Sequence, residues 1–71
     1  MKVFILAEYK RDDLTIRLAR CPDNSYVVIK GDIIAYHSSY EWALADFYEE
    51  VCEHSEAIDY ITSPDSYITI V

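Results

Sequence analysis

The 71-residue sequence predicts an α+β fold, in which a small antiparallel β-sheet carries one main amphipathic, acidic helix on one face. Runs of β-branched and aromatic residues separated by turn residues fill the first half of the chain, which is typical of short strands. A stripe of apolar residues with helical spacing follows. The apolar content of 52% is enough to build a core, which disordered chains cannot do. The expected element order is β-β-β-β-α-β, in a single domain over residues 1–71.

The first two expected strands form a hairpin. Residues 3–9 are rich in β-branched and aromatic side chains, and apolar and polar residues alternate over 14–19, as they do in a half-buried strand. The polar residues 10–13 between the two segments are expected to form the turn. This arrangement brings the apolar sides of both strands together. The expected pairs are Tyr9 with Leu14, Ala7 with Ile16, and Ile5 with Leu18.

Two more strands are expected to extend the sheet. Turn-forming residues at 22–25 precede the apolar run 26–30, and Gly31-Asp32 has the composition of a two-residue hairpin loop before the run 33–37. Continuing the pairing directs alternate residues of the strands to one side, which we expect to be the core. That side is expected to hold Ile5, Ile16, Leu18, Val27, Ile29, Ile34 and Tyr36.

The helix is expected to begin at Ser38, because Ser38 and Glu41 have the spacing of a capping box. Apolar residues then recur every three or four positions, which places them on one side of a helix that packs on the sheet. A second short helix capped by Ser55 is expected to extend to Ile61, and a terminal strand is expected over 67–71. The predicted apolar side of the helix consists of Tyr40, Leu44, Phe47, Val51 and Ile58.

Charge is distributed unevenly along the chain. The 13 acidic and 6 basic residues give a net charge of -7, and every lysine and arginine lies within the first 30 residues. Residues 31–71 therefore carry acidic side chains without a lysine or an arginine. Like charges three or four positions apart on a helix repel one another. Two interpretations stay open: a solvated surface that keeps the protein soluble, or a surface that binds a basic partner.

Trp42, the single tryptophan, falls on the acidic side of the expected helix rather than on its apolar side. It is expected either to cover a helix end or a sheet edge, or to anchor a protein partner, since Trp and Tyr are common in binding hot spots. Tyr60 falls at nearly the same angle around the helix. The candidate partner-binding residues are Trp42, Asp46, Glu49, Glu50, Glu53, Glu56, Asp59 and Tyr60.

The outer side of the predicted sheet carries apolar residues that would form a large exposed patch. Either the terminal strand or a second copy of the chain is expected to cover it, and the second alternative predicts a homodimer. The candidate self-association residues are Phe4, Leu6, Val28 and Ile33.

Motifs of enzyme chemistry are missing from the sequence. A glycine-rich phosphate loop needs several glycines, and Gly31 is the only one. The chain also lacks an HExxH motif, a nucleophile elbow and an EF-hand loop. We therefore expect no enzymatic activity, no metal site and no cofactor. The net negative charge disfavours direct binding of nucleic acid.

Neither a membrane segment nor a secretion signal is recognised in the sequence. No stretch approaches the roughly 20 apolar residues that cross a bilayer, and the apolar run after Lys2 is too short for a signal peptide. We therefore expect a cytoplasmic protein that does not bind membranes. Cys21 and Cys52 have no paired spacing and are expected to be reduced, mostly buried thiols.

In its general character the chain is similar to phage-type proteins that inhibit nucleic-acid-binding defence enzymes, such as anti-CRISPR or anti-restriction proteins. This similarity consists of small size, acidity and the lack of catalytic motifs. The segment from Asp46 to Asp59 would place six carboxylates along about 20 Å of helix, a spacing comparable to that of phosphates along a nucleic-acid strand. The leading hypothesis is a protein-binding inhibitor that occupies a basic nucleic-acid groove by charge mimicry. The alternative is a structural or adapter module that acts through its sheet face.

Overall fold

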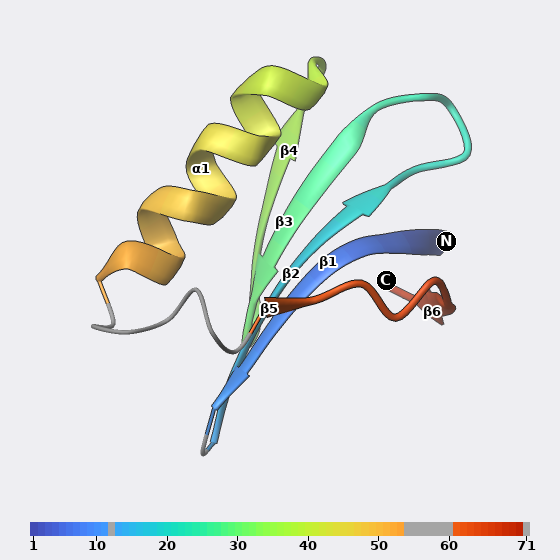
Figure 1. Ribbon diagram of the computed structural model, residues 1–71. Coiled ribbons are helices and arrows are strands. Elements are labelled where there is room, and N and C mark those ends of the chain that lie inside the picture. Colours follow the sequence, from blue (N-terminus) through green and yellow to red (C-terminus); the bar gives the residue numbers. More distant parts are fainter. Residues whose placement is uncertain (12, 54–60, 71) are drawn as a thin grey trace.

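The predicted α+β class is confirmed: an antiparallel sheet of six strands packs against one helix in the part of the chain that the structure describes (Figure 1). The structure is a computed structural model, and it describes residues 1–11, 13–53 and 61–70. The strand order is β4-β3-β2-β1, with β5 and β6 both paired with β1. The elements are β1 (Lys2–Arg11), β2 (Leu14–Arg20), β3 (Tyr26–Lys30), β4 (Ile33–His37), α1 (Tyr40–Cys52), β5 (Ile61–Thr62) and β6 (Tyr67–Thr69).

The hairpin of β1 and β2 has a tighter turn than the sequence predicted. The strands continue to Arg11 and Leu14, which pair directly, and Tyr9 pairs with Ile16. The expected pairs of Tyr9 and Ala7 are therefore wrong by two residues, and that of Ile5, which pairs with Ala19, is wrong by one. A slip of two residues keeps each side chain on its own face, because successive side chains alternate between faces. The apolar sides of the two strands still coincide near the turn.

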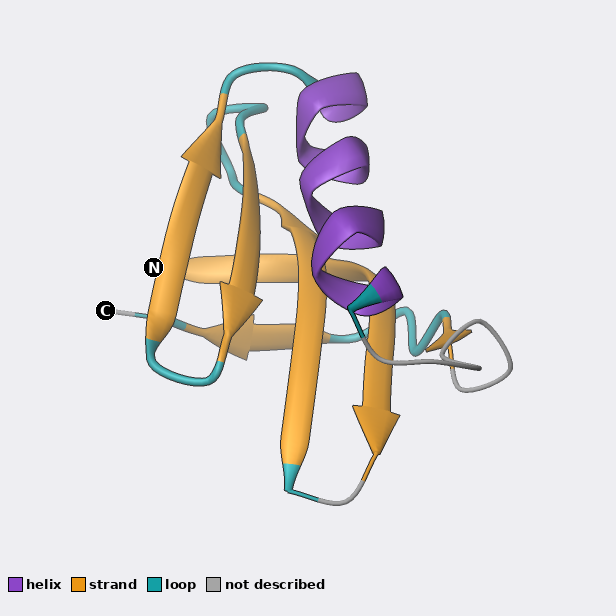
Figure 2. Cartoon of the chain, turned by 90° about the vertical axis from the view of Figure 1, so that its left-hand side faces the viewer, coloured by secondary structure: helices purple, strands orange, loops and turns teal. Residues whose placement is uncertain are grey.

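A β-bulge interrupts β1 at Leu6. Ala7 pairs with Leu18, whereas Ile5 pairs with Ala19, so Leu6 is an extra residue on β1. A bulge of this kind bends its strand and strengthens the twist. In Figure 2 the first part of β1 runs across the other strands instead of continuing along them. The expectation that Ile5 shares a face with Ile16 and Leu18 is therefore wrong, because the bulge moves it to the opposite face.

The faces of β3 and β4 are also opposite to those predicted. Leu18 pairs with Val28, so Val28 packs under the helix, while Val27 lies on the other side of the sheet. A change of one residue in register reverses every side chain of a strand. The predicted outward position of Val28 is wrong for this reason. The residues that were expected on the helix side and lie away from it are Val27, Ile29, Ile34 and Tyr36.

Both faces of the sheet are buried. The helix-side core joins α1 to the middle of the sheet, and it consists of Tyr9, Ile16, Leu18, Val28, Ala43, Phe47 and Val51. The opposite core lies beneath the bent start of β1 and the terminal segment, and it consists of Val3, Ile5, Ala19, Cys21, Val27, Ile29 and Ile70. The terminal segment thus covers the face of the sheet that lies away from the helix, through Ile70.

The helix begins one residue later than predicted. Ser39, not Ser38, is the N-cap, and its hydroxyl oxygen accepts a hydrogen bond of 3.3 Å from the backbone N–H of Trp42. The predicted capping box of Ser38 with Glu41 is therefore wrong. The second helix expected over 55–61 lies outside the described residues except for Ile61, which begins β5.

Replacing Ser39 with alanine is expected to lower the free energy of unfolding by about 1 kcal/mol, since it removes the acceptor for one unpaired N–H of the first turn. The same substitution at Ser38 provides the control and is expected to change stability much less. Denaturant unfolding of both variants, followed by circular dichroism, measures the difference. A larger loss for Ser38→Ala than for Ser39→Ala would contradict this assignment of the cap.

Candidate functional site

Trp42 lies in the first turn of α1 and projects into solvent. Its side chain is 72% exposed, the highest value among the large apolar residues that the structure describes. The opposite side of the helix is buried through Ala43, Phe47 and Val51. Trp42 therefore covers neither a helix end nor a sheet edge, and its ring is accessible to a second molecule.

Two of the candidate acidic residues point toward the sheet rather than into solvent. The Asp46 carboxylate lies 2.8 Å from Nε2 of His37 on β4, and the Lys30 ammonium donates a hydrogen bond of 2.8 Å to Glu50. About a quarter to a third of each of these side chains is exposed. Asp46 and Glu50 therefore help to hold the helix on the edge of the sheet.

Four of the exposed residues of α1 and its C-cap follow each other at spacings of three and four positions, which places them on one side of the helix. We call this side the Trp42 surface, and it consists of Trp42, Ala45, Glu49 and Glu53. All four are exposed. Glu53 lies 3.7 Å from the Lys30 ammonium, but its side chain is still 60% exposed. The Trp42 surface thus combines one large aromatic ring with two solvated carboxylates.

A cation from the first half of the chain compensates part of the acidic charge on the described part of the helix. Lys30 precedes the acidic half of the chain by one residue, and the β3–β4 hairpin places it beside α1. The hydrogen bond that it donates to Glu50 raises the pKa of Lys30. Its contribution to stability is therefore complete below the ordinary lysine pKa near 10.4 and is lost as the pH rises through the higher folded value.

The structure describes the predicted row of carboxylates only from Asp46 to Glu53. Glu56, Asp59 and Tyr60 lie outside the described residues. Within the described part, Glu49 and Glu53 face solvent and lie one helical turn apart, about 6 Å along the axis. Their spacing is wider than that of phosphates along a strand. The described acidic surface is therefore sparser than the sequence suggested.

The four candidate self-association residues do not form one outward surface. Val28 is buried in the helix-side core, and Leu6 is half-buried against the same core. Phe4 contacts the ring of Tyr67 at the other end of the molecule. Ile33, at the start of β4, is 69% exposed. It borders a small hollow of about 140 Å³ between β3, β4 and α1.

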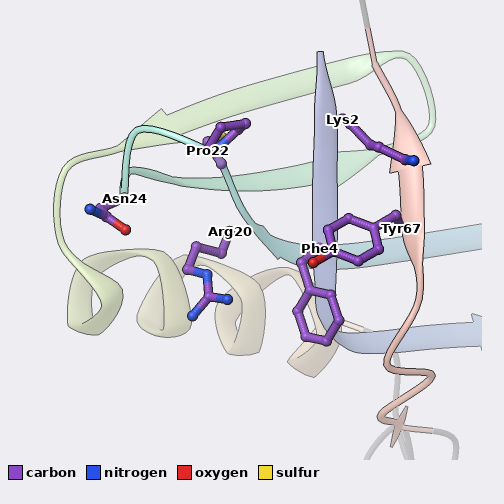
Figure 3. A pocket seen from close by; sticks show the side chains of 7 residues that line it. Lys2, Phe4, Arg20, Pro22, Asn24 and Tyr67 are labelled. Carbon is purple, nitrogen blue, oxygen red and sulfur yellow. The ribbon is translucent and has the colours of Figure 1, made fainter.

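A larger hollow was not predicted from the sequence. It has a volume of about 550 Å³ and lies where the start of β1, the end of β2 and β6 meet (Figure 3). Basic and aromatic side chains line it, contributed by segments far apart in the sequence. One feature of the sequence could have indicated a basic hollow: every lysine and arginine lies within residues 1–30. The lining residues are Lys2, Phe4, Arg20, Cys21, Pro22, Asn24 and Tyr67.

The thiol of Cys52 is exposed, and that of Cys21 is buried; neither forms a disulfide. The expectation of a mostly buried thiol is therefore wrong for Cys52, which occupies the last position of α1. In the described part of the chain, no helix has both the length and the apolar character required to cross a membrane.

No protein-family model, curated protein or solved structure matches the chain. The arguments about function that follow are therefore built on the exposure, the charges and the contacts of its own residues.

Proposed function

We propose that the protein is a binding inhibitor that docks the Trp42 surface onto the basic surface of a protein partner, and that this partner binds nucleic acid in the cytoplasm. The observation that carries the proposal is the 72% exposure of Trp42 on a helix whose other charged residues are all acidic. Exposed tryptophans are the residues that most often dominate binding energy at interfaces.

The indole of Trp42 is expected to supply most of the affinity. Burial of its exposed part removes on the order of 150 Å² of largely apolar area from water, which contributes about 3 to 4 kcal/mol. An exposed ion pair contributes about 1 kcal/mol or less. Glu49 and Glu53 are therefore expected to set the orientation and the rate of association rather than the lifetime of the complex.

The structure gives less support to the alternative of an adapter that acts through its sheet face. The helix-side core and the opposite core occupy both faces of the described sheet. A sheet-based contact would have to use the edge strand β4, where Ile33 and Tyr36 are exposed. Substitution of Ile33 therefore distinguishes this alternative from the Trp42 surface.

The experiment begins with capture of partners from cells, followed by competition between the purified chain and nucleic acid for the captured protein. The double variant Glu49→Lys/Glu53→Lys is expected to slow association at least tenfold and to remove most of its dependence on salt, because exposed charges are screened. Trp42→Ala is expected to raise the dissociation rate at least 100-fold. Surface plasmon resonance measures both rates.

The matched control is Asp13→Lys/Asp32→Lys, which makes the same change in net charge at exposed turn residues outside α1. It is expected to change the rates by less than about threefold. Binding that is indifferent to salt, to the charge reversals on α1 and to Trp42→Ala would end the proposal. Loss of binding with Ile33→Glu alone would favour the adapter.

A further inference from the structure

The strand β4 is an open edge of the sheet. It pairs with β3 on one side, and in the part of the chain that the structure describes no strand pairs with its other side. Such an edge presents a row of unpaired backbone donors and acceptors to another chain. Proteins commonly block their edges with lysine or proline, and β4 contains neither. Among the strands with one described partner, β4 has five residues, against two in β5 and three in β6.

The helix α1 runs beside this edge (Figure 1). Asp46 lies 2.8 Å from His37, the last residue of β4. One turn later Glu50 binds Lys30, whose register partner is the first residue of β4. The helix therefore runs along β4 in the opposite direction. Trp42 lies one turn before Asp46 on the same side of α1, so the Trp42 surface adjoins the open edge.

The small hollow of about 140 Å³ between the edge and the helix attracts a further cation. It is lined by Val28, Lys30, Ile33, Ala35, Asp46 and Glu50. Lys30 contacts both Glu50 and Glu53, and His37 adds a positive charge only when it is protonated. Three carboxylates therefore face one lysine. The aliphatic part of an incoming lysine or arginine can lie on the apolar residues while its charge reaches the carboxylates.

We propose that β4 binds an extended segment of the partner as an added strand, in which lysine or arginine alternates with apolar residues. The inference rests on the proposed function, since it names the part of the basic partner that meets the Trp42 surface. In strand addition, backbone hydrogen bonds supply affinity and alternate side chains supply specificity. The hollow is too small for a drug-sized ligand, whose sites have volumes of about 300 to 1,000 Å³, but it accepts a side chain.

The two faces of β4 explain why the residues of the added strand should alternate. Ile33 and Ala35 lie on the helix side, whereas Ile34 and Tyr36 lie on the other side. Successive side chains of an added strand alternate in the same way, so its basic residues reach α1 and its apolar residues pack beside Tyr36. Side chains on one face of a strand repeat about every 6.6 Å, close to the pitch of about 5.4 Å that separates helix residues one turn apart.

A second copy of the chain fits this edge less well than a basic segment does. Antiparallel pairing of two β4 strands about a two-fold axis would place both helices on the same side of the joined sheet. Each α1 carries four acidic residues and no basic one, in a chain with a net charge of -7. The two helices would therefore repel each other. Charge thus favours a basic occupant.

NMR titration with capped peptides tests the proposal. A peptide of alternating lysine and valine is expected to bind saturably, at least tenfold more tightly than a peptide of the same composition whose lysines and valines form two blocks. The reason is that only the alternating peptide presents one kind of side chain to each face. In the complex, the amide protons on the open side of β4 are expected to exchange with solvent at least tenfold more slowly.

Ala35→Lys tests the edge itself. It places a lysine on the helix side of β4, where it pairs with the carboxylates and repels incoming cations, and a lysine on an edge strand blocks pairing. The variant is expected to weaken binding of the alternating peptide at least tenfold, with circular dichroism as the check on folding. The matched control is Thr62→Lys, which adds the same charge at an exposed position of β5. It is expected to keep the affinity within threefold.

Several results would overturn the added strand: no saturable binding, equal affinities for the alternating and block peptides, tighter binding of an alternating glutamate–valine peptide, or equal losses with the two lysine variants. A dimer in sedimentation that Ala35→Lys disperses would assign the edge to a second copy instead. With the captured partner, Ala35→Lys and Trp42→Ala are both expected to weaken binding. Loss with Trp42→Ala alone would overturn the added strand and leave the proposed function intact. Loss with Ala35→Lys alone would overturn the proposed function, while the added strand would stand.

Discussion

Replacing Phe47 with alanine is expected to lower the free energy of unfolding by about 3 to 5 kcal/mol, as it does for buried phenylalanines in other cores. Phe47 is fully buried at the centre of the contact between α1 and the sheet. A chain of this length has a total stability of roughly 4 to 11 kcal/mol. The variant is therefore expected to unfold at a much lower denaturant concentration or to be unfolded at 37 °C.

Trp42→Ala is the matched control on the same helix. It removes a larger side chain than Phe47→Ala does, but the side chain is 72% exposed. Its expected loss of stability is about 1 kcal/mol or less, because little apolar area returns to water. Urea unfolding of the two variants measures the contrast. Equal losses would contradict the placement of these two residues on opposite sides of α1.

Val28→Asp is expected to prevent folding, since it places a carboxylate without a partner in the helix-side core. Val28 is 3% exposed and lies beneath α1. The loss is expected to exceed about 4 kcal/mol, combining lost packing with the burial of a polar group. The amide spectrum in heteronuclear NMR shows directly whether the chain is folded.

Ile33→Asp is the control for Val28→Asp. It makes the same kind of change on the neighbouring strand and on the same side of the sheet, but at a side chain that is 69% exposed. This variant is expected to remain folded and to lose less than about 1 kcal/mol. A folded Val28→Asp protein would support the outward position that the sequence had suggested.

The main elements could be predicted because their local patterns are strong. Alternation over 14–19 indicates a strand, and the recurrence of Phe47 and Val51 at helical spacing indicates a helix. The strand β5 has two residues, which is too short for a periodic signal. The N-cap was misplaced by one position because Ser38 and Ser39 are both good caps, and local chemistry does not choose between them.

The faces of the strands could not be predicted in the same way. Val27, Val28 and Ile29 are all apolar, and a strand buried on both faces shows no alternation from which to choose a side. The bulge at Leu6 has no glycine or proline to mark it. Both errors concern long-range pairing, which depends on how the whole sheet closes rather than on neighbouring residues.

The candidate sites were predictable to different degrees. The position of Trp42 on the acidic side of the helix follows from the helical repeat, and the structure shows the ring exposed. The contacts of Asp46 and Glu50 depend on where the β3–β4 hairpin places Lys30 and His37. The basic hollow depends on the row formed by Arg20, Phe4 and Tyr67, which exists after three distant segments have paired.

The pairing of β1 with β6 has a consequence for how the chain folds. The buried residues of the helix-side core lie within residues 9–51, whereas the opposite core needs Ile70. The hydrogen bonds between Met1 and Ile70 span 69 positions, and they are expected to form last because such distant pairing costs the most loop-closure entropy. Until then the start of β1 exposes one open edge and the apolar side chains Val3 and Ile5, and such surfaces invite aggregation.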